Sequence, residues 1–143
     1  MHVETILNRK GDTVYKVRPD QALTEAAEMM NRNRVGMALV CDNGELVGVL
    51  SERDIVGAIS RLGAVALADP VRRFMSRPVV TCRPGDSVED VMYTMSSRRI
   101  RHLPVVVDGK VLGVVSIGDV IHHRLAETQT EIAVLRDYAL ATS

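Results

Sequence analysis

Two short motifs, Ser51-x-x-Asp54 and Ser116-x-x-Asp119, hold the polar groups of this chain that are best placed for chemistry. Each follows an apolar run and precedes an apolar-striped segment, so each is predicted to lie where a strand turns into a helix. One interpretation is structural, because Ser at the N-cap and Asp three residues later form a capping box. The other is a binding site. Free backbone N–H groups and the helix dipole attract phosphate, the Ser hydroxyl adds a donor, and the carboxylate can accept both hydroxyls of a ribose.

The two motifs belong to an internal duplication. Residues 47–56 return as residues 112–121 without insertion or deletion, at an offset of 65 positions. Two copies in one register favour a nucleotide site over two unrelated caps. A repeat of about 60 residues buries too little surface to be stable alone. We therefore expect the two repeats to share a core. Repeat one comprises residues 1–66 and includes the N-terminal segment, and repeat two comprises residues 67–143 and includes a connector helix and a C-terminal helix.

The same elements are predicted in each repeat to position the motifs. Apolar spacing and turn residues indicate the order strand, helix, strand, strand, helix, which is a mixed α/β (α+β) fold. The predicted strands are 14–17 and 79–82, the helices 23–30 and 88–95, the hairpins 37–50 and 103–115, and the last helix runs from about 118 towards 138. Ser87 and Asp90 are placed as a capping box, whereas Ala22 leaves the earlier helix with a cap that is either weaker or supplied by Asp20. In the connector, Asp69 can cap and Pro70 can open a short helix.

Composition excludes several classes of partner. The 18 basic and 18 acidic residues cancel, so no global field attracts nucleic acid or a membrane surface. With no Trp, one Phe and three Tyr, platforms for stacking bases are scarce. No apolar run reaches the length of a membrane span, and the first residues do not form a signal peptide, so we expect a cytoplasmic protein. Cys41 and Cys82 are too few for a zinc motif and are interpreted as reduced core thiols.

The repeated Gly-x-x-Ser-x-x-Asp, the Asp-x-Gly or Asp-Gly turn before it, and the order of elements resemble a tandem pair of cystathionine-β-synthase-type (CBS) domains, also called a Bateman module. The resemblance covers about residues 10–125. It implies two pseudo-symmetric repeats packed through their sheets around a cleft with two adenosyl-ligand sites, in which Ser contacts phosphate and Asp contacts ribose. The residues that it assigns to adenine are Thr13, Val14, Met37 and Ala38 in repeat one, and Pro78, Val79, His102 and Pro104 in repeat two.

Several cations lie near the motifs. Arg53 could clamp phosphate in the first motif, whereas Gly118 replaces it in the second, so the two sites should differ. A surface salt bridge is the alternative role for Arg53. The only dense basic cluster consists of Arg98, Arg99, Arg101 and His102. One interpretation is a solvated loop. The other is a phosphate contact through Arg101, because in the fold that the resemblance implies this junction borders the cleft. His122 and His123 point about 100° apart on a helix, so no shared metal is expected.

The leading hypothesis is a non-catalytic regulatory sensor that binds AMP, ATP or NAD(H) and changes shape or partner affinity. No Walker loop, Gly-x-Gly-x-x-Gly or His and Cys cluster is present, so we expect no enzyme, no catalytic cofactor and no metal. The alternative is a pure protein-interaction or dimerisation module. We expect a homodimer, because helix faces such as Val120, Ile121 and Leu125 need cover and residues 127–138 suit a packing or dimer helix. We also expect a second partner, an unknown protein that this chain regulates.

Overall fold

The computed structural model describes residues 1–142, which form two compact units. The repeat-one unit consists of Thr13–Thr81 and Val106–Val111. The repeat-two unit consists of Met1–Asp12, Cys82–Val105 and the chain from Leu112 onward. These units follow spatial contacts and interleave along the chain, whereas the division at residues 66 and 67 follows sequence similarity.

The repeat-one unit is a three-stranded sheet with helices. Its sheet has the order β1-β2-β3, with β1 parallel and β3 antiparallel to β2. Its elements are β1 (Lys16–Val17), α2 (Leu23–Asn33), β2 (Met37–Asp42), β3 (Glu45–Ser51), α3 (Glu52–Leu62) and the short 3-10 helices η1 (Gly63–Ala68) and η2 (Val71–Arg73). Asn43 and Gly44 turn the hairpin with φ of 50° and 83°, the positive values that a two-residue type I′ turn requires.

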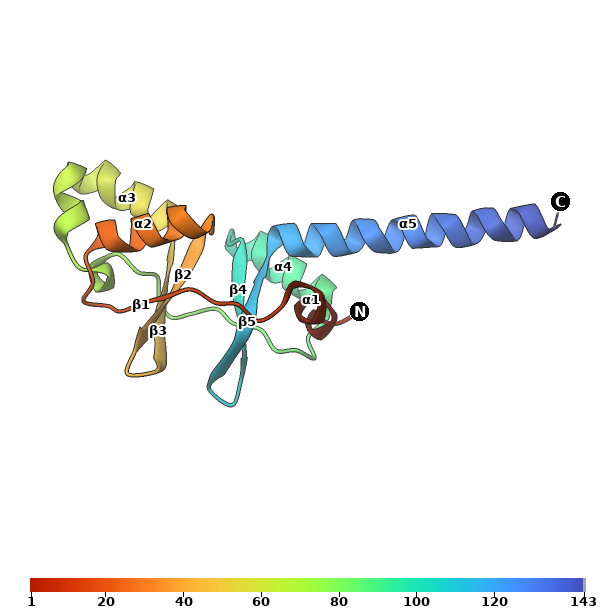
Figure 1. The fold of residues 1–143 in the computed structure, drawn as a ribbon, viewed down its shortest axis with the longest axis horizontal. Helices are drawn as coiled ribbons and strands as arrows, with labels where there is room; N and C mark the ends of the chain where they lie inside the picture. The colour runs from red at the N-terminus through yellow and green to blue at the C-terminus, as the bar shows by residue number, and fades with distance from the viewer. Residues whose placement is uncertain (143) are drawn as a thin grey trace. The chain divides into compact units, whose positions relative to one another are not determined.

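The repeat-two unit is built around a two-stranded sheet and one long helix. Its elements are α1 (Val3–Lys10), α4 (Val88–Arg98), the larger part of β4 (His102–Val107) and of β5 (Lys110–Ser116), and α5 (Ile117–Thr142). The turn of the β4–β5 hairpin, residues 106–111, belongs to the repeat-one unit. Both α1 and α4 pack against α5. Figure 1 shows α5 continuing well beyond α1 and α4, and its side chains from Thr128 to Ala141 are exposed.

The mixed α/β fold with its two hairpins and helices is confirmed. Equivalent apolar positions are buried in both units, as the periodicity requires. The buried pairs are Leu23 with Val88, Ala26 with Val91, Met30 with Met95, Ala38 with Leu103, Val40 with Val105, and Leu50 with Val115. Ser87 caps α4, because its Oγ accepts the N–H of Asp90 at 3.0 Å, but within residues 1–142 no return bond from the Ser87 N–H to the Asp90 carboxylate completes the predicted capping box. Ala22 gives α2 no side-chain cap, and Asp20 pairs with Arg18.

The predicted strand at 79–82 is wrong, because only Cys82 pairs there, in a single bridge to Val105. Pro104 explains the difference. In repeat one, the Leu39 N–H donates to the Tyr15 carbonyl at 2.8 Å and so holds β1 beside β2. Pro104 occupies the position equivalent to Leu39 and has no N–H to donate. The first predicted strand is also shorter than expected, since β1 contains only Lys16 and Val17.

Two further details differ from the sequence prediction. Helix α1 was not anticipated. In the connector, Pro70 rather than Asp69 is the N-cap of η2, and the Asp69 carboxylate instead pairs with Arg73 at 2.6 Å. None of the described helices combines the length and apolar character needed to cross a membrane.

Candidate functional site

Both Ser-x-x-Asp motifs form complete capping boxes. At the start of α3, the Asp54 N–H donates to Ser51 Oγ at 3.2 Å and the Ser51 N–H donates to Asp54 Oδ2 at 2.9 Å. At the start of α5, the Asp119 N–H donates to Ser116 Oγ at 3.1 Å and the Ser116 N–H donates to Asp119 Oδ2 at 2.8 Å. The structural interpretation is therefore confirmed. The boxes also hold each Ser and Asp beside a helix N-terminus, which is the arrangement that a phosphate and ribose site needs.

In repeat one, a segment of the connector covers the motif. Ser76 pairs with β3, donating its N–H to the Val49 carbonyl at 2.8 Å and accepting the Val49 N–H at 3.1 Å. The Ser76 hydroxyl also lies 3.0 Å from Asp54 Oδ1 and 3.2 Å from Oδ2. A hydroxyl therefore covers the carboxylate that we expected to bind ribose.

In repeat two, the end of α1 covers the motif with a cation. Lys10 Nζ lies 2.5 Å from Asp119 Oδ2 and 2.7 Å from the Val114 carbonyl oxygen. At the repeat offset of 65, Lys10 corresponds to Met75. Burial alone would raise the pKa of Asp119, but the hydrogen bond from Lys10, the Ser116 N–H and the Lys10 charge outweigh it and hold that pKa below its usual value. Asp119 is therefore a charged carboxylate already paired with an ammonium group.

The two motif glycines accommodate the chain itself. A Cβ on Gly48 would lie 2.7 Å from Met75 Sδ and 3.2 Å from the Ser76 carbonyl oxygen. A Cβ on Gly113 would lie 2.8 Å from Leu7 Cδ2. Gly48 and Gly113 therefore leave no room for a ligand against the backbone, because the connector and α1 already occupy that space.

The remaining residues expected in repeat one lie around the end of β3. Met37 faces Ser51 in the β2–β3 register, and Ala38 faces Leu50. Met37 is buried and Ala38 belongs to the core, so these two side chains present little surface. Val14 is half-buried, whereas Thr13 and Arg53 are exposed.

The residues expected in repeat two are divided between the units. The Ile117 N–H donates to the Arg101 carbonyl at 2.8 Å, which places the Arg101 backbone at the corner between β5 and α5. Pro104 is buried and His102 is half-buried in β4, while the side chains of Arg98, Arg99 and Arg101 are exposed. Pro78 and Val79 belong instead to the repeat-one unit, where they line an open cavity of about 670 Å³.

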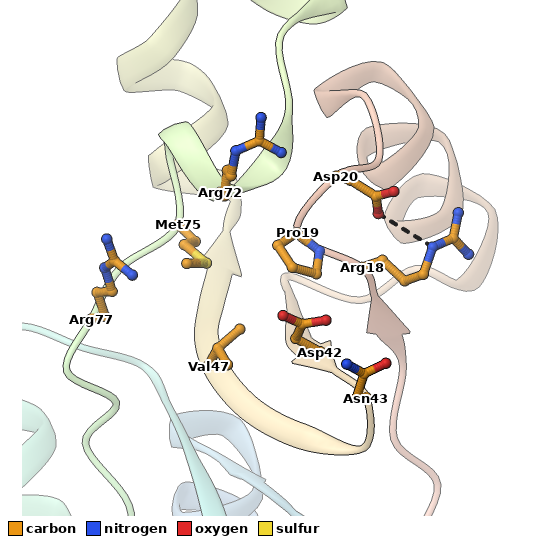
Figure 2. Close-up of a pocket in the computed structure, with 9 residues that line it drawn as sticks. All are labelled: Arg18, Pro19, Asp20, Asp42, Asn43, Val47, Arg72, Met75 and Arg77. Atoms are coloured by element: carbon orange, nitrogen blue, oxygen red, sulfur yellow. Dashed lines mark hydrogen bonds and ion pairs between the residues drawn. The ribbon is translucent and has the colours of Figure 1, made fainter.

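A second open cavity in the repeat-one unit, of about 600 Å³, was not anticipated. Figure 2 shows arginines and acidic side chains around it, with an ion pair of 3.3 Å between Arg18 Nε and Asp20 Oδ1. The lining residues are Arg18, Pro19, Asp20, Asp42, Asn43, Val47, Arg72, Met75 and Arg77. They include neither Ser51 nor Asp54, so this cavity is separate from the motif.

A smaller cavity, of about 180 Å³, contains the repeat-two carboxylate. Its lining residues are Ile6, Arg9, Lys10, Asp119, His122 and His123. The α1 residues were missed because the first ten positions were not assigned to a helix, although Val3, Ile6 and Leu7 have helical apolar spacing before Arg9 and Lys10. Within the part of the chain that the structure describes, no group of three or more His, Cys, Asp or Glu side chains could hold a metal ion.

Comparison with known proteins gives consistent matches. The CBS domain model matches residues 4–61 and 71–126. The CBS domain-containing protein YhcV of Bacillus subtilis is 34% identical over 113 residues, which are 79% of this chain and 80% of that protein. The crystal structure of the CBS-domain protein ATU1752 from Agrobacterium tumefaciens is 36% identical, covers 87% of this chain and 99% of its own, and superposes with a TM-score of 0.85.

A more distant structure contains ligands. It is the CBS domain pair of protein MJ0100 in complex with 5′-methylthioadenosine and S-adenosyl-L-methionine. The two chains are 25% identical, with a TM-score of 0.76 over 85% of this chain and 98% of the other.

Proposed function

The chain belongs to the CBS-domain family, and on that premise we propose that it is a regulatory module without chemistry of its own that binds an adenine nucleotide, namely AMP, ATP or NAD(H). The observation that carries the proposal is the duplicated corner. In both repeats a Ser hydroxyl, a carboxylate and the N-terminus of a helix are held together by a complete capping box.

The chemistry of an adenosyl ligand fits these groups. Asp54 and Asp119 would accept the ribose hydroxyls, and Ser51 and Ser116 would donate to phosphate, assisted by Arg53 in repeat one and Arg101 in repeat two. The residues proposed to contact adenine are Thr13, Val14, Met37 and Ala38 in one site, and Pro78, Val79, His102 and Pro104 in the other. The adenosyl ligands of protein MJ0100, which has the same fold, support this class of ligand.

A second candidate function is a protein-interaction module that binds no nucleotide. It is favoured by one observation, that both motif carboxylates already have partners within the chain. Asp54 accepts from the Ser76 hydroxyl and Asp119 pairs with the Lys10 ammonium group, so both carboxylates have hydrogen-bond donors without a ligand.

We also propose a cytoplasmic homodimer that acts on a regulated protein, with α5 as the dimer surface. Val120, which was expected to need cover at a dimer surface, is wholly buried and needs none. The exposed side of α5 carries apolar side chains at alternating spacings of four and three, the repeat of a coiled coil. The apolar members are Ile121, Leu125, Ile132, Leu135 and Ala139, and Thr128 occupies the remaining position.

Charge on both sides of this stripe favours a second copy as the occupant. Glu131 precedes Ile132, and Arg136 follows Leu135, so in a parallel pair Glu131 of one copy faces Arg136 of the second. Ile132 and Leu135, which lie between these two charged residues in the sequence, are 50% and 67% exposed, and helix–helix pairing would bury them.

The test of nucleotide binding is calorimetry and thermal unfolding with AMP, ADP, ATP, NAD(H), S-adenosylmethionine and the guanine counterparts. A ligand at 100 times its Kd should add about 2.7 kcal/mol to the free energy of unfolding. Binding of an adenine compound without turnover would support the module. If no adenine compound at millimolar concentration shifts the melting curve or gives heat, the nucleotide proposal fails and the interaction module remains.

A further inference from the structure

The cavity between α1 and α5 gathers two cations, two imidazoles and one carboxylate. Arg9 and Lys10 come from the end of α1, and His122 and His123 come from α5. Asp119 is the only acidic residue in the lining, and its charge is already met by Lys10. The remaining cationic and N–H groups therefore favour an anion.

His123 is the residue that most needs an explanation. It is 3% exposed, and neither ring nitrogen has a hydrogen-bond partner among residues 1–142. Its nearest carboxylate oxygen, Glu127 Oε1, lies 3.9 Å from Nε2, which is too far for a hydrogen bond. Buried polar groups are almost always paired, so the unpaired imidazole beside this cavity favours an acceptor that enters it.

Packing does not explain the histidine. At the repeat offset of 65, His123 corresponds to Ala58, which is wholly buried in α3. His122 corresponds to Gly57, and Lys10 corresponds to Met75. Repeat one therefore builds the same corner without any of these polar groups, so they are an addition specific to repeat two.

We propose that this cavity binds a phosphoryl group, with Arg9 and Lys10 as its cations and the imidazoles of His122 and His123 as N–H donors. The volume of about 180 Å³ is below the range of about 300–1,000 Å³ typical of whole small-molecule sites, so it suits a phosphoryl group and not an entire nucleotide. The group is either free phosphate or the phosphate of a nucleotide whose ribose binds Asp119, in which case the residues of this cavity, and not Arg101, supply the cations. Only the second source depends on the proposed nucleotide function.

The first experiment titrates the full chain with inorganic phosphate at neutral pH and follows the ring ¹⁵N signals of all four histidines by NMR. His122 and His123 should shift together and saturate, while His2 and His102, which lie outside the cavity, serve as internal controls. His123→Ala and Lys10→Met install the repeat-one residues and should each weaken phosphate by about tenfold. Either no shift, or an equal unsaturated shift of all four rings, would mean an adventitious ion only and would overturn the proposal.

The second experiment separates the two sources by calorimetry with AMP and adenosine on the same variants. If the phosphoryl group belongs to a nucleotide, both variants should weaken AMP by about tenfold and leave adenosine unchanged. Saturable phosphate binding without any nucleotide binding would identify free phosphate, sustain the site and refute the nucleotide proposal. If AMP binds equally to wild type and variants while phosphate leaves His122 and His123 unmoved, the phosphoryl site is wrong and the nucleotide proposal survives. Two variants are used because Lys10→Met, at the exposed end of α1, tests the site even if His123→Ala perturbs the core.

Discussion

Lys10 Nζ lies 2.5 Å from Asp119 Oδ2, although the two residues are 109 positions apart in the sequence. The equivalent carboxylate of repeat one, Asp54, accepts a hydrogen bond from the neutral Ser76 hydroxyl. The two motifs are thus alike in sequence and in capping but differ in what covers them. A ligand at Asp119 has to displace or share an ammonium group, whereas a ligand at Asp54 has to displace only a hydroxyl.

The Lys10–Asp119 pair should make part of the stability dependent on pH. Because the folded state lowers the pKa of Asp119, the pair stabilises above the unfolded value of roughly pH 4 and is lost as the pH falls through the folded pKa. Both side chains are partly exposed, so Lys10→Met should cost about 0.5–1 kcal/mol near pH 6 and less near pH 3. Urea unfolding across this range measures the difference. If Lys10→Met lowers the free energy of unfolding equally near pH 6 and near pH 3, Lys10 stabilises the fold by packing and not by charge.

Ribose recognition should depend on both carboxylates but not equally. Asp54→Ala and Asp119→Ala should each remove one ribose contact, and only one of them should abolish the tighter of the two binding events. Calorimetry with AMP measures this, and a dideoxy analogue without ribose hydroxyls is the control whose affinity neither variant should change. Identical effects of the two variants would contradict the asymmetry that Lys10 and Ser76 introduce.

Arg53 should matter for phosphate and not for adenosine. Arg53→Gly installs the residue that repeat two has at this position, Gly118. Loss of a charge-assisted hydrogen bond should weaken AMP by about tenfold while adenosine is barely affected. Titration of both ligands against wild type and variant tests this. Equal weakening of both would mean that Arg53 acts through the structure of α3.

The two motif glycines should differ in their tolerance of a side chain. In Gly48→Ala the new methyl group would meet the Ser76 carbonyl oxygen as well as Met75, whereas in Gly113→Ala its closest contact is the end of the Leu7 side chain, which can turn aside. We expect Gly48→Ala to lower the free energy of unfolding by about 1–3 kcal/mol and Gly113→Ala to cost less. Chemical denaturation of the two variants ranks them. A larger loss in Gly113→Ala would show that α1 resists displacement more than the connector does.

Self-association should depend on the apolar stripe of α5. The double variant Ile132→Asp with Leu135→Asp should convert a dimer to a monomer, because it places charges in the pairing surface. Val134→Asp is the matched control, since Val134 is 62% exposed but lies outside the stripe. Light scattering at tens of micromolar measures the mass. A wild-type monomer, or a dimer that survives the double variant, would contradict the proposed surface.

The local features of this fold could be predicted from the sequence because they depend on neighbouring residues. The turns at Asn43-Gly44 and Asp108-Gly109, the apolar stripes of α2 and α4, and both capping boxes involve groups only a few positions apart. The absence of the strand predicted at 79–82 traces to one residue farther along the chain, Pro104, and this became visible only once the structure showed that Leu39 donates the equivalent hydrogen bond in repeat one.

What covers each motif was decided only by the tertiary structure. The sequence alone determined that two Ser-x-x-Asp corners exist, that Arg53 has no counterpart in repeat two, and that the halves share one pattern. It could not show that Lys10 reaches Asp119, that Ser76 reaches Asp54, or that His123 is buried without a partner. These contacts join residues far apart in the chain, and they depend on how α1 and the connector cross the strands. Repeat spacing and helical periodicity carry no information about that crossing.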